Sequence, residues 1–212
     1  MATPAIIFGP EDVDYALSQL GLDRDGLAEC AKIADSQRAL CTSNDVKGFD
    51  LILMNDKIGR ALREQFVGKE WEKDEFENQP GIKNPKLRIR VIPCNFDDGA
   101  GRVDMNPSNL CTKGAASRSK TRCNKTPWLR GLEAPEEIPT ESYTTYVFGT
   151  YFEKDCILRA ELSLPLDFKS GKYLLFKPRI IILSGDDENG RATRRQDREG
   201  PTEIVDIPVA RR

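Results

Sequence analysis

Residues 156–164 read Cys-Ile-Leu-Arg-Ala-Glu-Leu-Ser-Leu, and this stretch decides the fold class. Apolar residues stand at every second position from Cys156 to Leu164, and mostly polar side chains stand between them. Successive side chains of a β-strand point to opposite faces of a sheet, so the alternation predicts a strand with one buried face. We expect Pro165 to end this strand, because proline has no N–H to donate to a sheet ladder.

Further strand patterns lie on both sides of this segment. They are residues 143–152, which are rich in β-branched and aromatic side chains, residues 87–91, which alternate and are expected to end at Pro93, and the segments 173–176 and 179–183 after a turn at Ser170-Gly171. Short connections favour antiparallel pairing, since parallel strands need long crossovers. The strands therefore predict a mostly antiparallel sheet, a meander of three to five strands.

The first third of the chain has the periodicity of helices instead. We predict one short helix from Pro10 to Gly21, a second after the capping residue Asp23 and a third over residues 50–66. Residues 69–86 lack a consistent apolar period and contain the turn dipeptides Pro80-Gly81 and Asn84-Pro85, which indicates a connection. Helices followed by strands predict the α+β class.

The predicted organisation is a single α+β domain over residues 1–183, with a helical part (10–68) and a strand-rich part (87–183). Residues 184–212 carry blocks of acids and arginines with few apolar residues. Such a segment buries too little surface to offset its ordering entropy, so we expect a flexible loop and C-terminal segment.

The composition excludes several kinds of chemistry. The 212 residues include 32 Lys and Arg, 34 Asp and Glu, and no histidine, which excludes Ser-His-Asp and Cys-His nucleophiles and histidine-ligated metals. None of the six cysteines forms a CxxC pair, so we predict thiols rather than a zinc site and no bound cofactor. No apolar run is long enough to span a membrane, and no signal peptide is evident, which predicts a cytoplasmic protein without a membrane partner.

A basic segment is the strongest compositional anomaly. Residues 105–132 contain no acid, and they carry the candidate ligand-binding residues Lys113, Arg118, Lys120, Arg122, Lys125, Trp128 and Arg130. Cationic side chains neutralise phosphates and an aromatic ring can stack on a base, so the leading hypothesis is a non-enzymatic accessory protein that binds nucleic acid or another phosphate-bearing ligand. Two other interpretations stay open: the segment docks on the acidic N-terminal helices, or it only confers solubility.

Carboxylates form a second, enzymatic candidate. Asp97 and Asp98 follow a predicted strand, and Glu161 lies on the polar face of another. Such residues can hold Mg²⁺, so the alternative is a metal-dependent nuclease or phosphodiesterase using Asp97, Asp98 and Glu161, with Asp97 and Glu161 as metal ligands. The pattern partly resembles a restriction-nuclease-like core, but such cores have Glu-x-Lys and this chain has serine at position 163. The competing interpretation is a turn at Asp97 and an ion pair between Glu161 and a cross-strand base.

The third hypothesis is a protein-interaction subunit of a larger complex. An exposed edge of the meander, the arginine-rich segment 191–198 or the C-terminal Arg211-Arg212 would then contact a protein partner, an acidic one in the case of the arginines.

Overall fold

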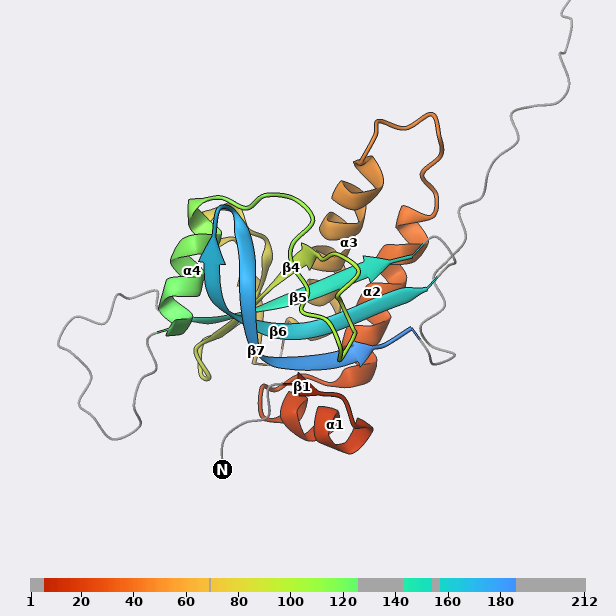
Figure 1. The fold of residues 1–212 in the computed structure, drawn as a ribbon. Coiled ribbons are helices and arrows are strands. Elements are labelled where there is room, and N and C mark those ends of the chain that lie inside the picture. Colours follow the sequence, from red (N-terminus) through yellow and green to blue (C-terminus); the bar gives the residue numbers. More distant parts are fainter. Residues whose placement is uncertain (1–5, 69, 126–142, 154–156, 186–212) are drawn as a thin grey trace, which may run out of the picture.

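The computed structural model describes residues 6–68, 70–125, 143–153 and 157–185 (Figure 1). Its elements follow the order β1 (Ile6–Ile7), α1 (Pro10–Ser18), α2 (Arg24–Arg38), α3 (Phe49–Phe66), β2 (Glu72–Asp74), the 3-10 helix η1 (Phe76–Asn78), β3 (Gly81–Asn84), β4 (Ile89–Asn95), α4 (Ala115–Lys125), β5 (Thr144–Phe152), β6 (Leu158–Lys169) and β7 (Lys172–Leu183). The α+β class is confirmed. The predicted boundary at residue 183 stays a prediction, because residues 186–212 lie outside the described ranges.

The three N-terminal helices are confirmed. Proline occupies the first turn of α1, where its missing N–H costs no hydrogen bond, and Val13 and Leu17 of this helix are buried. The side chain of Asp23 accepts a hydrogen bond of 2.6 Å from the backbone N–H of Gly26 and so caps α2. The third helix, α3, packs against α2. These helices are placed by apolar stripes and caps that are local in sequence.

The sheet corrects the prediction of a three- to five-stranded antiparallel meander. It is mixed and has seven strands among the described residues, in the order β1-β7-β6-β5-β4-β3-β2. The meander β5-β6-β7 is present, and Ser170 and Gly171, with φ of 52° and 79°, form the two-residue turn between β6 and β7. The segment between β4 and β5 contains α4, and this long crossover allows the two strands to pair in parallel. At one edge, β1 pairs in parallel with β7.

Prolines do not end the strands, contrary to expectation. Pro93 lies inside β4 opposite Phe148 of β5, beyond the last residue of β4 that pairs with β3, Val91. Its missing N–H therefore removes no bond of the β3 ladder. Pro165 lies inside β6 between two shifts of register against β7, and such bulges tolerate proline.

The predicted connection over residues 69–86 is also wrong, since it contains β2, η1 and β3. Its pattern is misleading because a buried position is charged: Asp74 of β2 is 4% exposed and pairs with Arg90 of β4, which is 2% exposed. The guanidinium of Arg90 also lies 4.7 Å from the centre of the Phe76 ring. These two charges lie far apart in the sequence and meet only because the strands pair. The sequence of β2 therefore has a charge where the apolar alternation of a strand would have an apolar residue.

Both faces of the sheet are covered. Strand β4 alternates between two clusters: Ile89 and Val91 pack with the buried residues of α1, α2 and α3, whereas Ile92 and Cys94, with Phe96 directly after the strand, pack with Tyr173 and Phe176. Helix α4 packs on β5 and β6 and lies apart from the N-terminal helices (Figure 1). Among the described residues no helix has the length and hydropathy needed to cross a membrane.

Candidate functional site

Helix α4 divides the basic segment into an inner and an outer face. Ser117, Lys120 and Thr121 are buried, and the exposed residues of the outer face are Ala115, Arg118, Ser119, Arg122 and Cys123. Lys113 is half-buried and precedes the helix. The side chain of Lys125, together with Trp128 and Arg130, lies outside the described residues. The basic segment is therefore not one uniform surface.

Lys120 belongs to the interior rather than to a ligand-binding surface. Its Nζ donates to the backbone oxygen of Phe76 at 3.2 Å and forms an ion pair of 2.9 Å with Glu77. Burial lowers the pKa of Lys120, and the contact with Glu77 opposes this shift. One interpretation was that the segment docks on the acidic N-terminal helices. Lys120 does not follow it, because its acidic partner, Glu77, is in η1.

The outer face of α4 carries positive charge that no acid of the described residues compensates. Arg118 and Arg122 are four residues apart, so their side chains leave the same side of the helix one turn apart. Within the described part of the chain neither arginine has an ion pair with an acid. Both line a shallow hollow of about 500 Å³ together with Ala115, Ser119 and Cys123.

Glu161 is fully buried and has no acceptor site left for a metal ion. Arg179 Nε and Ser163 Oγ donate to Oε1 at 3.0 and 2.6 Å, and Arg179 Nη2 and the backbone N–H of Gly101 donate to Oε2 at 2.6 and 2.8 Å. A carboxylate offers about four lone-pair sites, and these four donors use them. The pairing of Glu161 with a cross-strand base is thus observed, with Arg179 of β7 as that base.

Of the two aspartates that were candidates for the nuclease, Asp97 stabilises a turn and Asp98 is exposed. Asp97 Oδ1 accepts hydrogen bonds from the backbone N–H groups of Gly99 at 3.3 Å and Ser108 at 2.9 Å. Asp98 is exposed, and its backbone oxygen accepts from Arg159 at 3.3 Å. Among the described residues no group of three or more His, Cys, Asp or Glu side chains is placed to hold a metal ion. Asp97 and Glu161 do not fit a shared Mg²⁺, because the lone pairs of Glu161 already accept other donors.

A polar pocket that the sequence did not reveal lies between α3, η1, β4, α4 and β7. We call it the Cys94 pocket; its volume is about 240 Å³, and its polar lining consists of Asn55, Asn78, Gln79, Cys94, Lys113, Ser117 and Tyr173. Burial raises the pKa of the Cys94 thiol to about 11, although the ammonium of Lys113 contacts it and acts in the opposite direction. Burial also raises the pKa of the Tyr173 hydroxyl well above its usual value.

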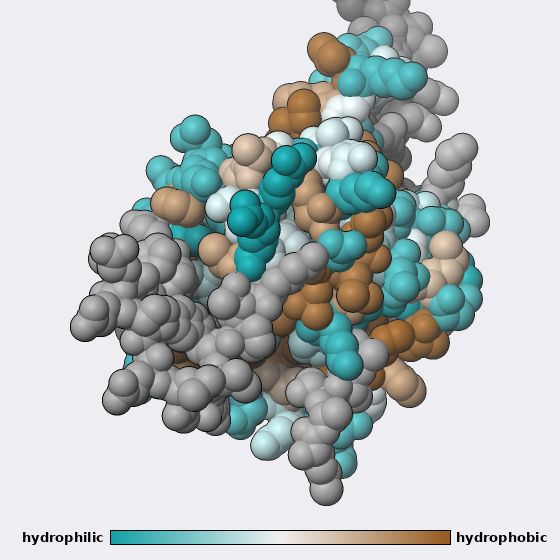
Figure 2. All heavy atoms as spheres, turned by 60° about the vertical axis from the view of Figure 1, so that its left-hand side comes forward, coloured by the Kyte–Doolittle hydropathy of each residue, from teal (hydrophilic) through white to brown (hydrophobic). Residues whose placement is uncertain are grey.

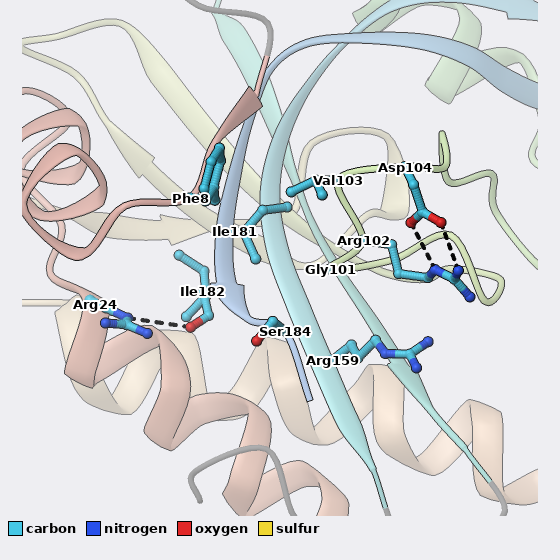
Figure 3. A pocket seen from close by; sticks show the side chains of 10 residues that line it. All are labelled: Phe8, Arg24, Gly101, Arg102, Val103, Asp104, Arg159, Ile181, Ile182 and Ser184. Carbon is cyan, nitrogen blue, oxygen red and sulfur yellow. Dashed lines mark hydrogen bonds and ion pairs between the residues drawn. The ribbon is translucent and has the colours of Figure 1, made fainter. Parts of the chain in front are cut away.

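A larger hollow of about 590 Å³ lies beside the end of β7 (Figure 3). Three arginines line it, but each interacts within the protein. Arg102 forms an ion pair of 2.8 Å with Asp104, Arg159 forms one of 2.8 Å with Glu153, and Arg24 donates to the backbone oxygen of Ile182 at 3.3 Å. Figure 3 shows the Arg102 side chain turned toward Asp104. The positive charge of this hollow is therefore largely balanced.

Exposed apolar side chains and sheet edges bear on the hypothesis of a protein partner. In Figure 2, which brings the side carrying α4 forward, a band of hydrophobic side chains runs among hydrophilic ones. Around the connection from α2 to α3 the exposed apolar residues are Leu40, Val46, Phe49 and Ile52. The edge strands β1 and β2 have only two and three residues, and short edges discourage the addition of a further strand. Residues 191–198 and 211–212 lie outside the described ranges.

The comparison of the chain with protein-family models, with curated proteins and with solved structures found no match. The candidate sites therefore rest on the geometry of this chain alone.

Proposed function

We propose that the protein binds nucleic acid through the phosphate backbone, by means of the outer face of α4. The observation that supports this proposal is the pair of exposed arginines, Arg118 and Arg122, one turn apart on a helix without an acidic residue. Guanidinium groups bind phosphate oxygens in a bidentate manner, and the hydroxyl of the exposed Ser119, which lines the same hollow, adds a donor. The hollow there is shallow, which suits an extended polyanion better than a small molecule.

Because Lys120 is buried, fewer cations of the basic segment are available to contact nucleic acid. Three side chains of the basic segment point to different environments: Lys120 is buried, Lys113 faces the Cys94 pocket, and Arg118 is exposed. The proposed contacts are thus few, and the affinity they support is that of nonspecific, salt-dependent binding.

Fluorescence anisotropy with labelled single-stranded DNA, single-stranded RNA and duplex DNA tests the proposal. We expect binding that weakens as salt rises, and a double variant, Arg118→Ala with Arg122→Ala, whose slope of log K against log salt is smaller by about 1–2. The matched control is Arg60→Ala with Lys86→Ala, which removes the same charge from two exposed, acid-paired side chains. Equal losses in both double variants, or binding that does not depend on salt, would refute the proposal.

The nuclease alternative has weaker support, because the four hydrogen bonds of Glu161 occupy its carboxylate. Cleavage of labelled DNA or RNA in the presence of Mg²⁺ or Mn²⁺, lost in Asp97→Asn, would restore it.

A further inference from the structure

Half of the ten residues that line the Cys94 pocket belong to the protein interior. Cys94, Ser117 and Tyr173, which come from β4, α4 and β7, are 1%, 0% and 2% exposed. Gln79 Nε2 donates to Ser117 Oγ at 2.9 Å, which fixes both side chains. The cavity thus has defined positions for polar groups, whereas the outer face of α4 is open to solvent.

The charge of the pocket favours an anion. None of the ten described residues that line it is acidic, and Lys113 supplies a positive charge. The thiol of Cys94 does not neutralise this charge, since with a pKa of about 11 it keeps its proton at neutral pH. A second cation, Lys172, lies close enough to act on the same thiol. An anionic group beside Lys113 would therefore meet an ammonium that has no carboxylate partner among the described residues.

Two acceptors in the same pocket call for a donor on the ligand. Asn55 Oδ1 and Gln79 Oε1 are buried atoms without a hydrogen-bond partner. A buried acceptor that stays unpaired costs stability, so native proteins normally pair such atoms with protein, water or ligand. Two hydroxyl groups on a ligand would satisfy both oxygens, whereas sulfate carries no donor and hydrogenphosphate carries one.

The size of the pocket limits the ligand. Its volume of about 240 Å³ corresponds to roughly eight water molecules at about 30 Å³ each, and it is smaller than the usual pocket for a drug-sized molecule. A nucleic-acid strand does not enter a cavity of this size, so this site is separate from the surface proposed above.

We propose that the Cys94 pocket binds a small hydroxylated anion, a hydroxy acid or a sugar phosphate, with its anionic group at Lys113 and its hydroxyls at Asn55 and Gln79. The hydroxyls of Tyr173 and Ser117, which lie beside each other, complete the polar lining of the site.

Titration calorimetry of the full chain tests this site with glycerol 3-phosphate and glycerate as probes, and with inorganic phosphate and glycerol as comparisons. We expect saturable binding of at least one probe below about 10 mM, weakened about tenfold or more in Lys113→Met, the loss that follows removal of a charge-assisted hydrogen bond. The backbone amide resonances of Cys94, Lys113 and Tyr173 should shift on addition of the probe.

Controls separate this site from the nucleic-acid surface. Arg118→Met removes one charge from the outer face of the same helix and should leave probe binding unchanged, while Lys113→Met should leave the unfolding free energy nearly unchanged. The proposal is overturned if neither probe binds, if Arg118→Met and Lys113→Met weaken binding equally, or if inorganic phosphate binds as tightly as both probes.

Discussion

Arg179 of β7 holds both carboxylate oxygens of Glu161 of β6, with Nε–Oε1 and Nη2–Oε2 distances of 3.0 and 2.6 Å, and both side chains are buried. The same guanidinium donates to the backbone oxygens of Gly99, Arg102 and Met105. Arg179 therefore connects the loop after β4 to the sheet. It also occupies the carboxylate of Glu161, which a metal site at this position would need.

Removing one partner of this pair should destabilise the protein strongly. We expect Glu161→Gln to lower the free energy of unfolding by about 3–5 kcal/mol, because it leaves the Arg179 charge buried and unpaired. Urea unfolding measures the change. The matched control is Asp104→Asn, which breaks the exposed pair with Arg102 and should have no measurable effect. Similar stabilities for Glu161→Gln and the wild type would show that the pair is not formed.

The burial of Lys120 predicts a pH dependence. Its pKa in the folded state lies below the ordinary value of 10.5, mainly because of burial, so between the two values the unfolded chain binds more protons than the folded one. Stability then rises with pH in this window. The free energy of unfolding of the wild type, relative to Lys120→Met, should increase as the pH approaches 10.5. A difference that decreases over this range would contradict the buried position of the ammonium.

Gly149 of β5 should not tolerate a side chain. A Cβ at this position would lie 2.1 Å from carbon atoms of the Phe96 ring, which is fully buried. We expect Gly149→Ala to cost about 1–3 kcal/mol or more through overpacking, measured by thermal or urea unfolding. Gly114→Ala is the control, since nothing lies within 4 Å of its Cβ position. If both variants unfold at the same denaturant concentration, the contact between Phe96 and Gly149 is wrong.

The cysteines should fall into two classes of reactivity. In a Cys156→Ser background, we expect Cys111 and Cys123, which are exposed, to react rapidly with Ellman's reagent. The buried Cys30, Cys41 and Cys94 should react only after unfolding; burial raises the pKa of Cys30 to about 12 and that of Cys94 to about 11, so few thiolates form. The absorbance of the thionitrobenzoate that the reagent releases, followed over time, counts the thiols that have reacted. More than two fast thiols in the native protein would contradict the burial of Cys30, Cys41 and Cys94.

Part of the candidate site could be predicted from the sequence, and part could not. The absence of acids around Arg118 and Arg122 marks a basic surface in the linear chain. The different role of Lys120 depends on the face of α4 that it occupies and on Glu77, which is distant in sequence. The Cys94 pocket left no local signal, because its lining comes from separate elements and each lining residue is ordinary in its own segment.

Local patterns were sufficient for the N-terminal helices and for the β5-β6-β7 meander, because stripes, caps and two-residue turns depend on neighbours in the chain. The parallel pairing of β4 with β5, the strands hidden in residues 69–86 and the continuation of β4 through Pro93 were decided only by the tertiary structure. For the hidden strands and for Pro93 the reason is the same. A buried charge such as Asp74 is acceptable where a distant residue supplies the ion pair. A proline such as Pro93 is acceptable in a strand where the neighbouring ladder has ended. Neither condition can be read from adjacent residues.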